Sequence, residues 1–167
     1  MSELRIGIAG YGVIGKRRRG CVDANPFMTT VAVCDKKFAD DGTLDDGIAY
    51  SREYEKLFNH DLDAVLVCMS NDMAAEITIA ALERGLHVFC EKPIDLSLER
   101  VQQCTQIVEQ SDCKALVAFN RRFDPEYNTA KKKVSEGVIG EIEQLIIISR
   151  DPAPAPQAYI HVSGGIF

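Results

Sequence analysis

The stretch LRIGIAGYGVIG, from Leu4 to Gly15, decides the fold of this chain. Residues 4–9 predict a short β-strand, and residues 13–24 predict a helix that ends before Asn25-Pro26. Between them lies the pattern GxGxxG, formed by Gly10, Gly12 and Gly15. The pattern alone is a weak signal, but between a strand and a helix it indicates a dinucleotide site.

Each glycine of this pattern has a physical role at such a site. Gly10 allows the tight turn, Gly12 lets a pyrophosphate approach the backbone, and Gly15 lets the helix pack closely on the strand. The start of the helix offers unpaired N–H groups and the positive end of its dipole to the phosphates. We therefore expect the whole loop to contact the cofactor, including Tyr11, Val13 and Ile14.

An acidic residue supports the dinucleotide interpretation and indicates which dinucleotide is bound. Asp35 follows the second expected strand, residues 30–34, about 20 residues after the last glycine. A carboxylate there accepts hydrogen bonds from the ribose hydroxyls and repels a 2′-phosphate, which favours NAD over NADP. Lys36 and Lys37 could tolerate the phosphate, so NADP remains the alternative. The basic run Lys16–Arg19 is expected to be a solvated helix face, with help to a phosphate as the alternative.

The first 120 residues alternate short apolar runs with helical patterns. Further strands are expected at 64–68, 86–90 and 115–119, and further helices at 73–84 and 98–110, the latter with Ser97 as N-cap. Residues 40–60 are polar and predict one or two short helices around a brief strand. Apolar strands separated by helices predict an α/β fold, a doubly wound parallel sheet covered on both faces. Residues 1–120 are thus expected to form a Rossmann domain.

The pattern changes after Asn120. Residues 125–136 predict a helix ended by Gly137, and residues 142–149 (IEQLIIIS) predict a long strand. We interpret 121–167 as the truncated beginning of a C-terminal α/β domain. Because an apolar strand with open edges seeks a partner, we also expect a homo-oligomer that forms through residues 142–149.

Composition excludes several classes of protein. The net charge of −6 argues against a nucleic-acid surface, and no apolar stretch is long enough for a membrane span. The N-terminus lacks the pattern of a signal peptide. The six cysteines show no CxxC spacing, and the three histidines are not spaced as metal ligands. We therefore expect a cytoplasmic protein with free cysteines and without a metal site.

Two more loops are expected at the carboxyl ends of the strands, where open α/β sheets bind ligands. Ser70 and Asn71 follow one strand and are candidates for cofactor contacts. Glu91 and Lys92 follow the next strand. Lys92 is the best catalytic candidate, because its ammonium could reach a substrate hydroxyl and Pro93 restricts its backbone. A surface lysine at the start of a loop is the alternative.

These motifs together resemble the Gfo/Idh/MocA oxidoreductases, in particular the inositol and polyol dehydrogenases of that family. The resemblance rests on residues 10–15, Asp35, 91–96, 120–125 and 149–167, and spans essentially the whole chain. It implies an N-terminal Rossmann domain, a C-terminal α/β domain whose open sheet makes the oligomer interface, NAD as cofactor, and a polyol or sugar as substrate.

The resemblance also implies roles for single residues. Lys92 would bind the hydroxyl being oxidised, with Glu91 fixing the loop and Pro93 setting the direction of the lysine. Asn120 and Arg121 would lie near the nicotinamide and the substrate. Asp151 and Tyr159 would border the polyol pocket.

The sequence departs from the family pattern at two points. Where relatives have a histidine, three residues after Asn71, this chain has Ala74. The family's general-base motif follows a Gly-Gly-Ile-Phe segment, and here Phe167 is the last residue. The main hypothesis is therefore an NAD-dependent polyol dehydrogenase whose chain is truncated and inactive alone. The alternatives are a non-catalytic dinucleotide-binding module and a structural partner of a full-length relative.

Overall fold

The computed structural model describes residues 3–150, 153, 154, 157–160 and 163, and only the backbone of residues 158 and 159. The chain divides into two compact units, Met1–Ala118 (unit 1) and Phe119–Phe167 (unit 2). Each unit is described by itself.

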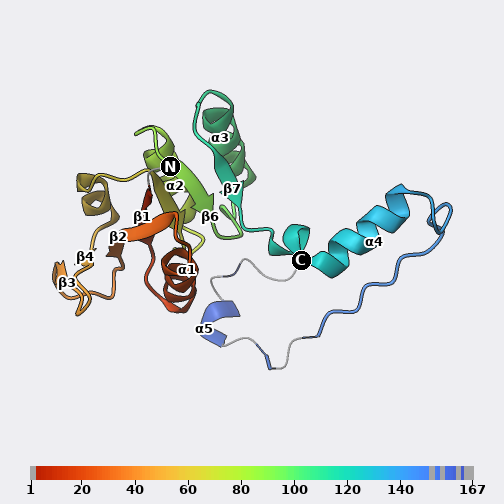
Figure 1. Ribbon diagram of the computed structural model, residues 1–167, viewed down its shortest axis with the longest axis horizontal. Helices are drawn as coiled ribbons and strands as arrows, with labels where there is room; N and C mark the ends of the chain where they lie inside the picture. Colours follow the sequence, from red (N-terminus) through yellow and green to blue (C-terminus); the bar gives the residue numbers. More distant parts are fainter. Residues whose placement is uncertain (1–2, 151–152, 155–156, 161–162, 164–167) are drawn as a thin grey trace. The chain divides into compact units, whose positions relative to one another are not determined.

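A seven-stranded sheet forms the centre of unit 1, in the order β3-β4-β2-β1-β5-β6-β7 (Figure 1). The strands are β1 (Leu4–Ala9), β2 (Met28–Cys34), β3 (Gly42–Thr43), β4 (Ala49–Ser51), β5 (Ala64–Val67), β6 (His87–Cys90) and β7 (Ala115–Val117). Every pairing is parallel except that of β3 with β4. The expected parallel sheet is confirmed, and its order reverses direction beside β1, where doubly wound sheets bind ligands.

The register of the strands brings four loops to one edge of the sheet. Ala9, the last residue of β1, pairs with Cys34 in β2 and with Val67 in β5. Val67 pairs in turn with Cys90 at the end of β6. The segments that follow these four residues therefore begin side by side.

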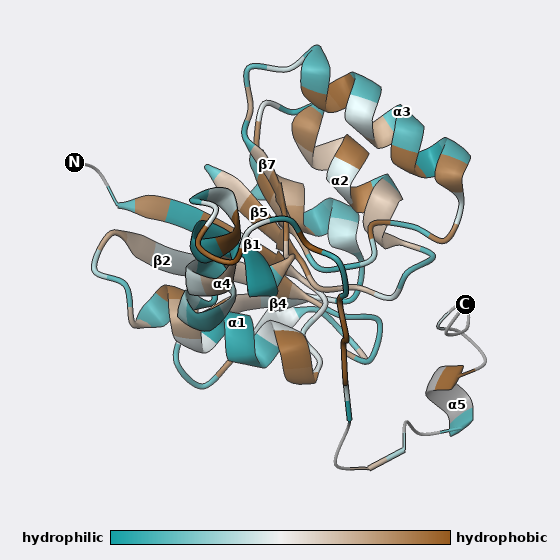
Figure 2. Cartoon of the chain, turned by 90° about the vertical axis from the view of Figure 1, so that its right-hand side faces the viewer, coloured by the Kyte–Doolittle hydropathy of each residue, from teal (hydrophilic) through white to brown (hydrophobic). Residues whose placement is uncertain are grey.

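The helices of unit 1 cover the two faces of the sheet differently. They are α1 (Val13–Asp23), the 3-10 helix η1 (Tyr54–Asn59), α2 (Ala74–Leu82) and α3 (Leu98–Glu109). Figures 1 and 2 show α1 on one face and α2 with α3 on the other. Ser97 caps α3 by accepting the backbone N–H of Arg100 at 3.5 Å, as expected.

Apolar side chains fill both sides of the central strands. Ile6 and Ile8 of β1 pack with Val33 on the α1 side. On the other side Val65 and Ile77, both 0% exposed, join β5 to α2. Each fully buried side chain of this size contributes about 1.5–3 kcal/mol, so the packing of the central strands is a main source of the stability of unit 1.

The expectation that both faces are covered is met only in part within unit 1. Beside α1 the sheet opens into an apolar groove of about 440 Å³. Its lining includes Cys21 of α1, Leu66, Phe89 and Leu116, and Leu116 is 45% exposed. The backbone of α1 packs mainly against β1, β2 and β5, while Arg18 reaches over to Phe89 in β6, and the groove lies beside these contacts.

Residues 40–60 differ from the prediction in the order of their elements. A β-hairpin, β3 with β4, comes first, and a single short helix, η1, follows. The hairpin turns at Gly47, whose φ is 88°. Short polar strands carry no clear period-2 signal, which explains why the sequence did not reveal this hairpin.

Unit 2 contains η2 (Asn120–Phe123), α4 (Pro125–Ser135) and α5 (Gln157–Ile160). Asp124 caps α4 by accepting the N–H groups of Glu126 at 2.9 Å and Tyr127 at 3.2 Å. Gly137, with φ of 71°, follows the helix as predicted. The predicted strand 142–149 is wrong: the segment has no regular secondary structure. A strand exists only through hydrogen bonds to a neighbouring strand, and no described residue offers one to this segment.

Candidate nucleotide-binding site

The glycine loop has the geometry that its sequence predicts. Gly10 has a φ of 92°, and a Cβ there would lie 2.5 Å from the carbonyl oxygen of Cys68. A Cβ on Gly15 would lie 1.8 Å from the carbonyl oxygen of Gly10. A Cβ on Gly12 would meet no atom within 4 Å. Gly10 and Gly15 are therefore needed by the fold, whereas the space at Gly12 is open to a ligand.

The start of α1 fits an anionic ligand. Gly12 is the N-cap, no side chain accepts a hydrogen bond from the first turn, and the first turn has no acidic residue. The first N–H groups of a helix need acceptors, and the helix dipole favours a negative one. The pyrophosphate of a dinucleotide is such an acceptor, and the open space at Gly12 would let it approach.

Asp35 is held in place at the end of β2 with only 9% of its surface exposed. Its Oδ2 accepts the backbone N–H of Tyr11 at 2.8 Å, and its Oδ1 accepts that of Lys37 at 2.9 Å. Each carboxylate oxygen keeps a further lone pair, so the group can also accept from the two hydroxyls of a ribose. Lys36 is exposed beside it.

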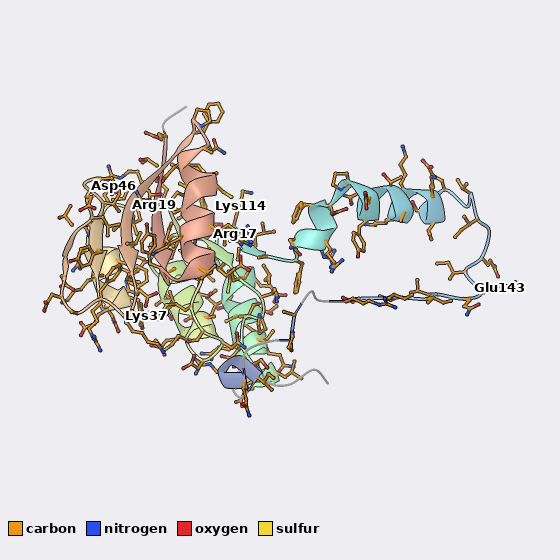
Figure 3. The ribbon with its side chains drawn as sticks, turned by 90° about the horizontal axis from the view of Figure 1, so that it is seen from below. Arg17, Arg19, Lys37, Asp46, Lys114 and Glu143 are labelled. Atoms are coloured by element: carbon orange, nitrogen blue, oxygen red, sulfur yellow. The ribbon has the colours of Figure 1, made fainter. Side chains whose placement is uncertain are left out.

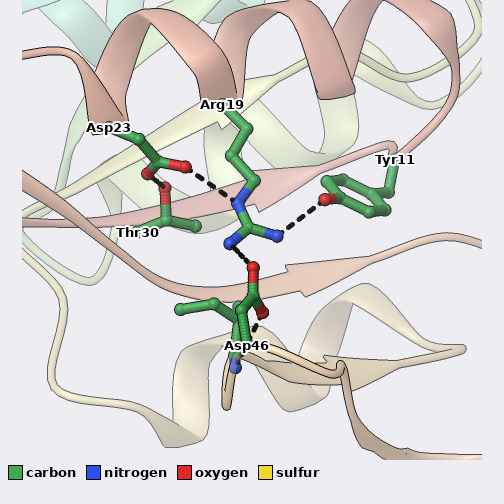
Figure 4. A network of polar contacts seen from close by, with 6 residues as sticks. Tyr11, Arg19, Asp23, Thr30 and Asp46 are labelled. Carbon is green, nitrogen blue, oxygen red and sulfur yellow. Dashed lines mark hydrogen bonds and ion pairs between the residues drawn. The ribbon is translucent and has the colours of Figure 1, made fainter.

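A polar network next to Asp35 was not predicted from the sequence. The Arg19 guanidinium donates to the Tyr11 hydroxyl at 2.8 Å and to Asp23 at 3.1 Å, and it also binds Asp46 (Figure 4). Thr30 adds a hydrogen bond to Asp23 at 2.8 Å. Asp46 lies in the β3–β4 turn, 27 residues from Arg19, and no sequence rule joins positions at that distance.

An aromatic row extends the same corner of unit 1. The rings of Tyr11 and Phe38 are stacked with centroids 6.2 Å apart, and those of Phe38 and Tyr50 are 4.4 Å apart. The row joins the glycine loop to the segment after β2 and to β4. Phe38 therefore packs against the Tyr11 ring, while the Tyr11 backbone is held by Asp35.

The prediction of a solvated basic face for residues 16–19 is wrong for half of the run. Lys16 and Arg17 are exposed, as expected. Arg18 and Arg19 have side chains only 29% and 13% exposed, and both form ion pairs. The reason is the helix period, which turns these two residues toward the sheet and its loops.

The Glu91 loop is tied to α1. Arg18 forms an ion pair with Glu91 at 2.5 Å, and its guanidinium lies 5.1 Å from the centre of the Phe89 ring. Lys92 follows with an exposed side chain, and the Lys92–Pro93 peptide bond is cis. Glu91 thus anchors the loop, and Lys92 follows it just beyond β6, at the edge of the sheet where the glycine loop also begins.

The loop after β5 completes this edge. Ser70 accepts the backbone N–H of Met73 at 3.0 Å, and its hydrogen bond to Asp72 holds the pKa of that carboxyl below its usual value. Asn71 lies in the turn between them. Ala74, where the family pattern has a histidine, is 2% exposed and belongs to the core.

The remaining site candidates belong to unit 2. Arg121 donates to the hydroxyl of Tyr127, and with Asn120 and Asp124 these residues line a cavity of about 180 Å³. Asp151 lies outside the described residues. Tyr159 lies in α5, and its side chain is outside the described part of the chain.

The described ranges were also searched for metal and membrane features. They contain no group of three or more His, Cys, Asp or Glu residues that could hold a metal ion. No helix in the same ranges combines the length and the hydropathy needed to cross a bilayer.

Comparison with known proteins agrees with the geometry of the glycine loop. A family model, GFO_IDH_MocA, described as "Oxidoreductase family, NAD-binding Rossmann fold", matches residues 4–119. An inositol 2-dehydrogenase from Rhizobium meliloti is 39% identical over 168 residues, which cover 98% of this chain and 50% of the relative. The chain thus spans about half the length of the curated relatives it matches.

Two solved structures extend this comparison. A myo-inositol dehydrogenase from Corynebacterium glutamicum gives a TM-score of 0.83 at 34% identity, covering 98% of this chain and 50% of that one. A scyllo-inositol dehydrogenase from Lactobacillus casei, with bound NAD(H) and scyllo-inositol, gives 0.74 at 27% identity, covering 84% and 43%.

Proposed function

Since this chain belongs to the GFO_IDH_MocA family of oxidoreductases, with its NAD-binding Rossmann fold, we propose that it is the cofactor-binding part of an NAD-dependent inositol or polyol dehydrogenase. The activity proposed for the whole protein is hydride transfer from a secondary alcohol of a polyol to the nicotinamide. Two relatives support this substrate class: the inositol 2-dehydrogenase and the scyllo-inositol complex.

The observation that carries the proposal is the pairing of Gly12 with Asp35. Gly12 leaves open space at an uncapped helix start, and Asp35 is nearly buried with its carboxylate held by two backbone N–H groups. The first feature suits a pyrophosphate and the second suits a ribose diol. Together they support NAD rather than a mononucleotide or a simple phosphate.

Bound NAD would supply the hydride acceptor, and the residues of this chain would orient the alcohol. Lys92 would donate a hydrogen bond to the reacting hydroxyl and favour its loss of a proton. Glu91 would hold the loop through its ion pair with Arg18. Ser70, Asn71 and Asn120 are proposed for the nicotinamide half of the cofactor, and Arg121, Asp151 and Tyr159 for the polyol.

Isothermal titration of the 167-residue chain with NAD tests the proposal. We expect saturable binding with one site per chain, and at least tenfold weaker binding for Gly12→Val, whose side chain would occupy the pyrophosphate space. Gly20→Ala is the matched control, because a Cβ there also meets no atom within 4 Å but lies two turns along α1. Absence of NAD binding in the folded wild-type chain would refute the proposal.

A second measurement addresses the polyol. NADH absorbance is followed after addition of myo-inositol and NAD, with Lys92→Met as the control for any turnover. Loss of turnover in that variant at unchanged NAD affinity would support the role of Lys92. Unchanged turnover would remove Lys92 from the reaction. NAD binding without turnover in this chain would mean that hydride transfer needs residues equivalent to the half of the relatives that this chain does not cover.

We also propose a cellular location and an oligomeric state. We place the protein in the cytoplasm, because all six cysteines are free although the chain has enough of them for disulfides. We propose a homo-oligomer because the side chains of residues 145–148 are each at least 71% exposed and apolar. Contiguous apolar surface of this kind marks an interaction site.

A further inference from the structure

Asp46 contacts the nucleotide-binding corner without belonging to any motif. It lies in the β3–β4 turn and binds the guanidinium of Arg19, which projects from α1. Figure 4 shows the two side chains meeting, and Figure 3 labels Arg19 and Asp46 on one side of α1 and Arg17 on the other. Arg19 in turn donates to the Tyr11 hydroxyl at 2.8 Å, and the Tyr11 backbone donates to Asp35 at 2.8 Å.

We propose that Asp46 is a cofactor-specificity residue, which favours NAD by keeping the Arg19 guanidinium away from a 2′-phosphate. The inference rests on the proposed dinucleotide function and deepens it. Asp35 is one acidic group that disfavours the phosphate. Asp46 acts on the same choice indirectly, because it neutralises Arg19, the cation that is hydrogen-bonded to the Tyr11 hydroxyl and that could otherwise compensate for the phosphate charge.

Arg19 is the right group to be restrained in this way. Its guanidinium is a planar fork that binds phosphate in a bidentate manner, so a free Arg19 would be a ready-made phosphate ligand. In the structure its Nε faces Asp23, its Nη1 faces Tyr11 and its Nη2 faces Asp46. All three nitrogens are therefore engaged within the protein, and the side chain is only 13% exposed.

The charges of the cluster formed by Arg19, Asp23 and Asp46 also favour NAD over NADP. Asp23 and Asp46 bring two negative charges to one positive charge on Arg19, so the cluster carries a net charge of −1. The hydrogen bond from Arg19 lowers the pKa of Asp46, so this carboxylate stays ionised at neutral pH. Removal of the Asp46 charge would make the cluster neutral and free one end of the guanidinium.

Three basic residues nearby do not replace Arg19. Lys16 lies with its ammonium 5.6 Å from the centre of the Tyr11 ring and is exposed. Lys36 and Lys37 follow Asp35 and are exposed as well. Their flexible ammonium groups act as point charges in water, whereas Arg19 is already fixed beside Tyr11 and loses little freedom on binding.

The experiment measures the ratio of NADP affinity to NAD affinity. In the full chain, Asp46→Asn is expected to tighten NADP binding by about tenfold while NAD affinity changes by less than about threefold. Asp45→Asn is the matched control: it removes the same charge from the adjacent, exposed position, whose side chain has no contact with Arg19 among the described residues. Asp45→Asn should leave the ratio unchanged.

A double variant shows whether a gain in NADP affinity comes from Arg19 or from the asparagine side chain itself. Arg19→Met combined with Asp46→Asn should lose the gain in NADP affinity, because the gain comes from the released guanidinium. A gain that persists in the double variant would overturn the inference. So would equal changes in both affinities for Asp46→Asn, since a purely structural contact between the hairpin and α1 would affect NAD and NADP alike.

The outcomes also distinguish this inference from the proposed function. A folded wild-type chain that binds neither dinucleotide refutes the function itself. A wild-type chain that binds NAD, with a ratio that Asp46→Asn does not change, refutes only the role of Asp46. Thermal melts of each variant confirm folding, and Asp46→Ser replaces Asp46→Asn should the latter fail to fold.

Discussion

The backbone N–H of Tyr11 donates to the Asp35 carboxylate at 2.8 Å, and so joins the glycine loop to the end of β2. The contact lies within the protein itself and fixes the glycine loop and the expected ribose acceptor relative to each other. A binding site that is ordered in advance loses less conformational entropy when its ligand arrives. The same contact makes Asp35 part of the fold as well as part of the site.

Replacement of Asp35 should therefore affect both stability and binding. Asp35→Ala leaves the N–H groups of Tyr11 and Lys37 without their acceptor, which we expect to lower the free energy of unfolding by about 1–3 kcal/mol. NAD affinity should fall by at least about tenfold because the ribose hydroxyls lose their acceptor. Urea denaturation and isothermal titration measure the two effects. Asp40→Ala, at an exposed position nearby, should change neither.

Two glycines of one motif should respond to alanine in opposite ways. Gly15→Ala would place a Cβ 1.8 Å from the Gly10 carbonyl oxygen, so backbone must move and we expect a loss of more than about 3 kcal/mol of stability. Gly12→Ala meets no atom within 4 Å and should melt close to the wild-type temperature while it weakens NAD binding. Thermal melts with and without NAD separate the two. Equal destabilisation by both variants would contradict the roles assigned here.

Much of unit 1 could be predicted because its signals are local. The apolar run of residues 4–9, the glycine pattern and the N-cap Ser97 before α3 each mark an element through short-range physics. The β3–β4 hairpin and the absent strand at 142–149 could not be predicted, because each depends on what the segment pairs with. The Arg19–Asp46 contact escaped for the same reason, since only the folded hairpin brings the two residues together.

The Arg18–Glu91 ion pair should stabilise unit 1 measurably. Both side chains are less than one-third exposed, at 29% and 18%, so removal of Arg18 leaves a partly buried carboxylate without its partner. We expect Arg18→Met to lower the free energy of unfolding by about 1–2 kcal/mol. Arg17→Met, an exposed neighbour on α1, is the control and should have little effect in the same urea titration. A similar loss for both variants would assign the effect to helix propensity or net charge.

Self-association through residues 142–149 remains a prediction that light scattering can test. Ile146 and Ile148 are 71% and 74% exposed, and lysine at both positions should make the segment incompatible with an apolar interface. We expect the wild-type chain to have a larger, concentration-dependent mass and the double lysine variant to be monomeric. Lysine in place of Gln144 and Ser149, two exposed neutral residues of the same segment, gives a charge-matched comparison that keeps the isoleucines. A wild-type chain that is monomeric at all concentrations would rule out this interface.

Three thiols at the carboxyl edge of the sheet should make stability depend on pH in the alkaline range. Burial raises the pKa of Cys34 and Cys68 to about 12 and that of Cys90 to about 11. Unfolded chains lose these protons near pH 8.5, whereas the folded chain keeps them, so stability is complete below that pH and falls as the pH rises toward 11–12. Each thiol contributes a slope of about 1.4 kcal/mol per pH unit within this window. Urea midpoints measured across the window should fall less steeply for Cys34→Ala than for the wild-type chain.

The apolar groove beside α1 has a thermodynamic consequence for unit 1. Leu66, Phe89 and Leu116 line a space of about 440 Å³, and surface that is hydrated in the folded unit gains no new hydration on unfolding. Such surface adds nothing to the heat-capacity increment, which scales with the apolar area newly exposed to water. A calorimeter should therefore find a smaller increment, and a flatter stability curve, for unit 1 than for a doubly wound domain of equal length with two covered faces. Any molecule that fills the groove would be detected as a negative heat-capacity change of binding, whatever the sign of its enthalpy.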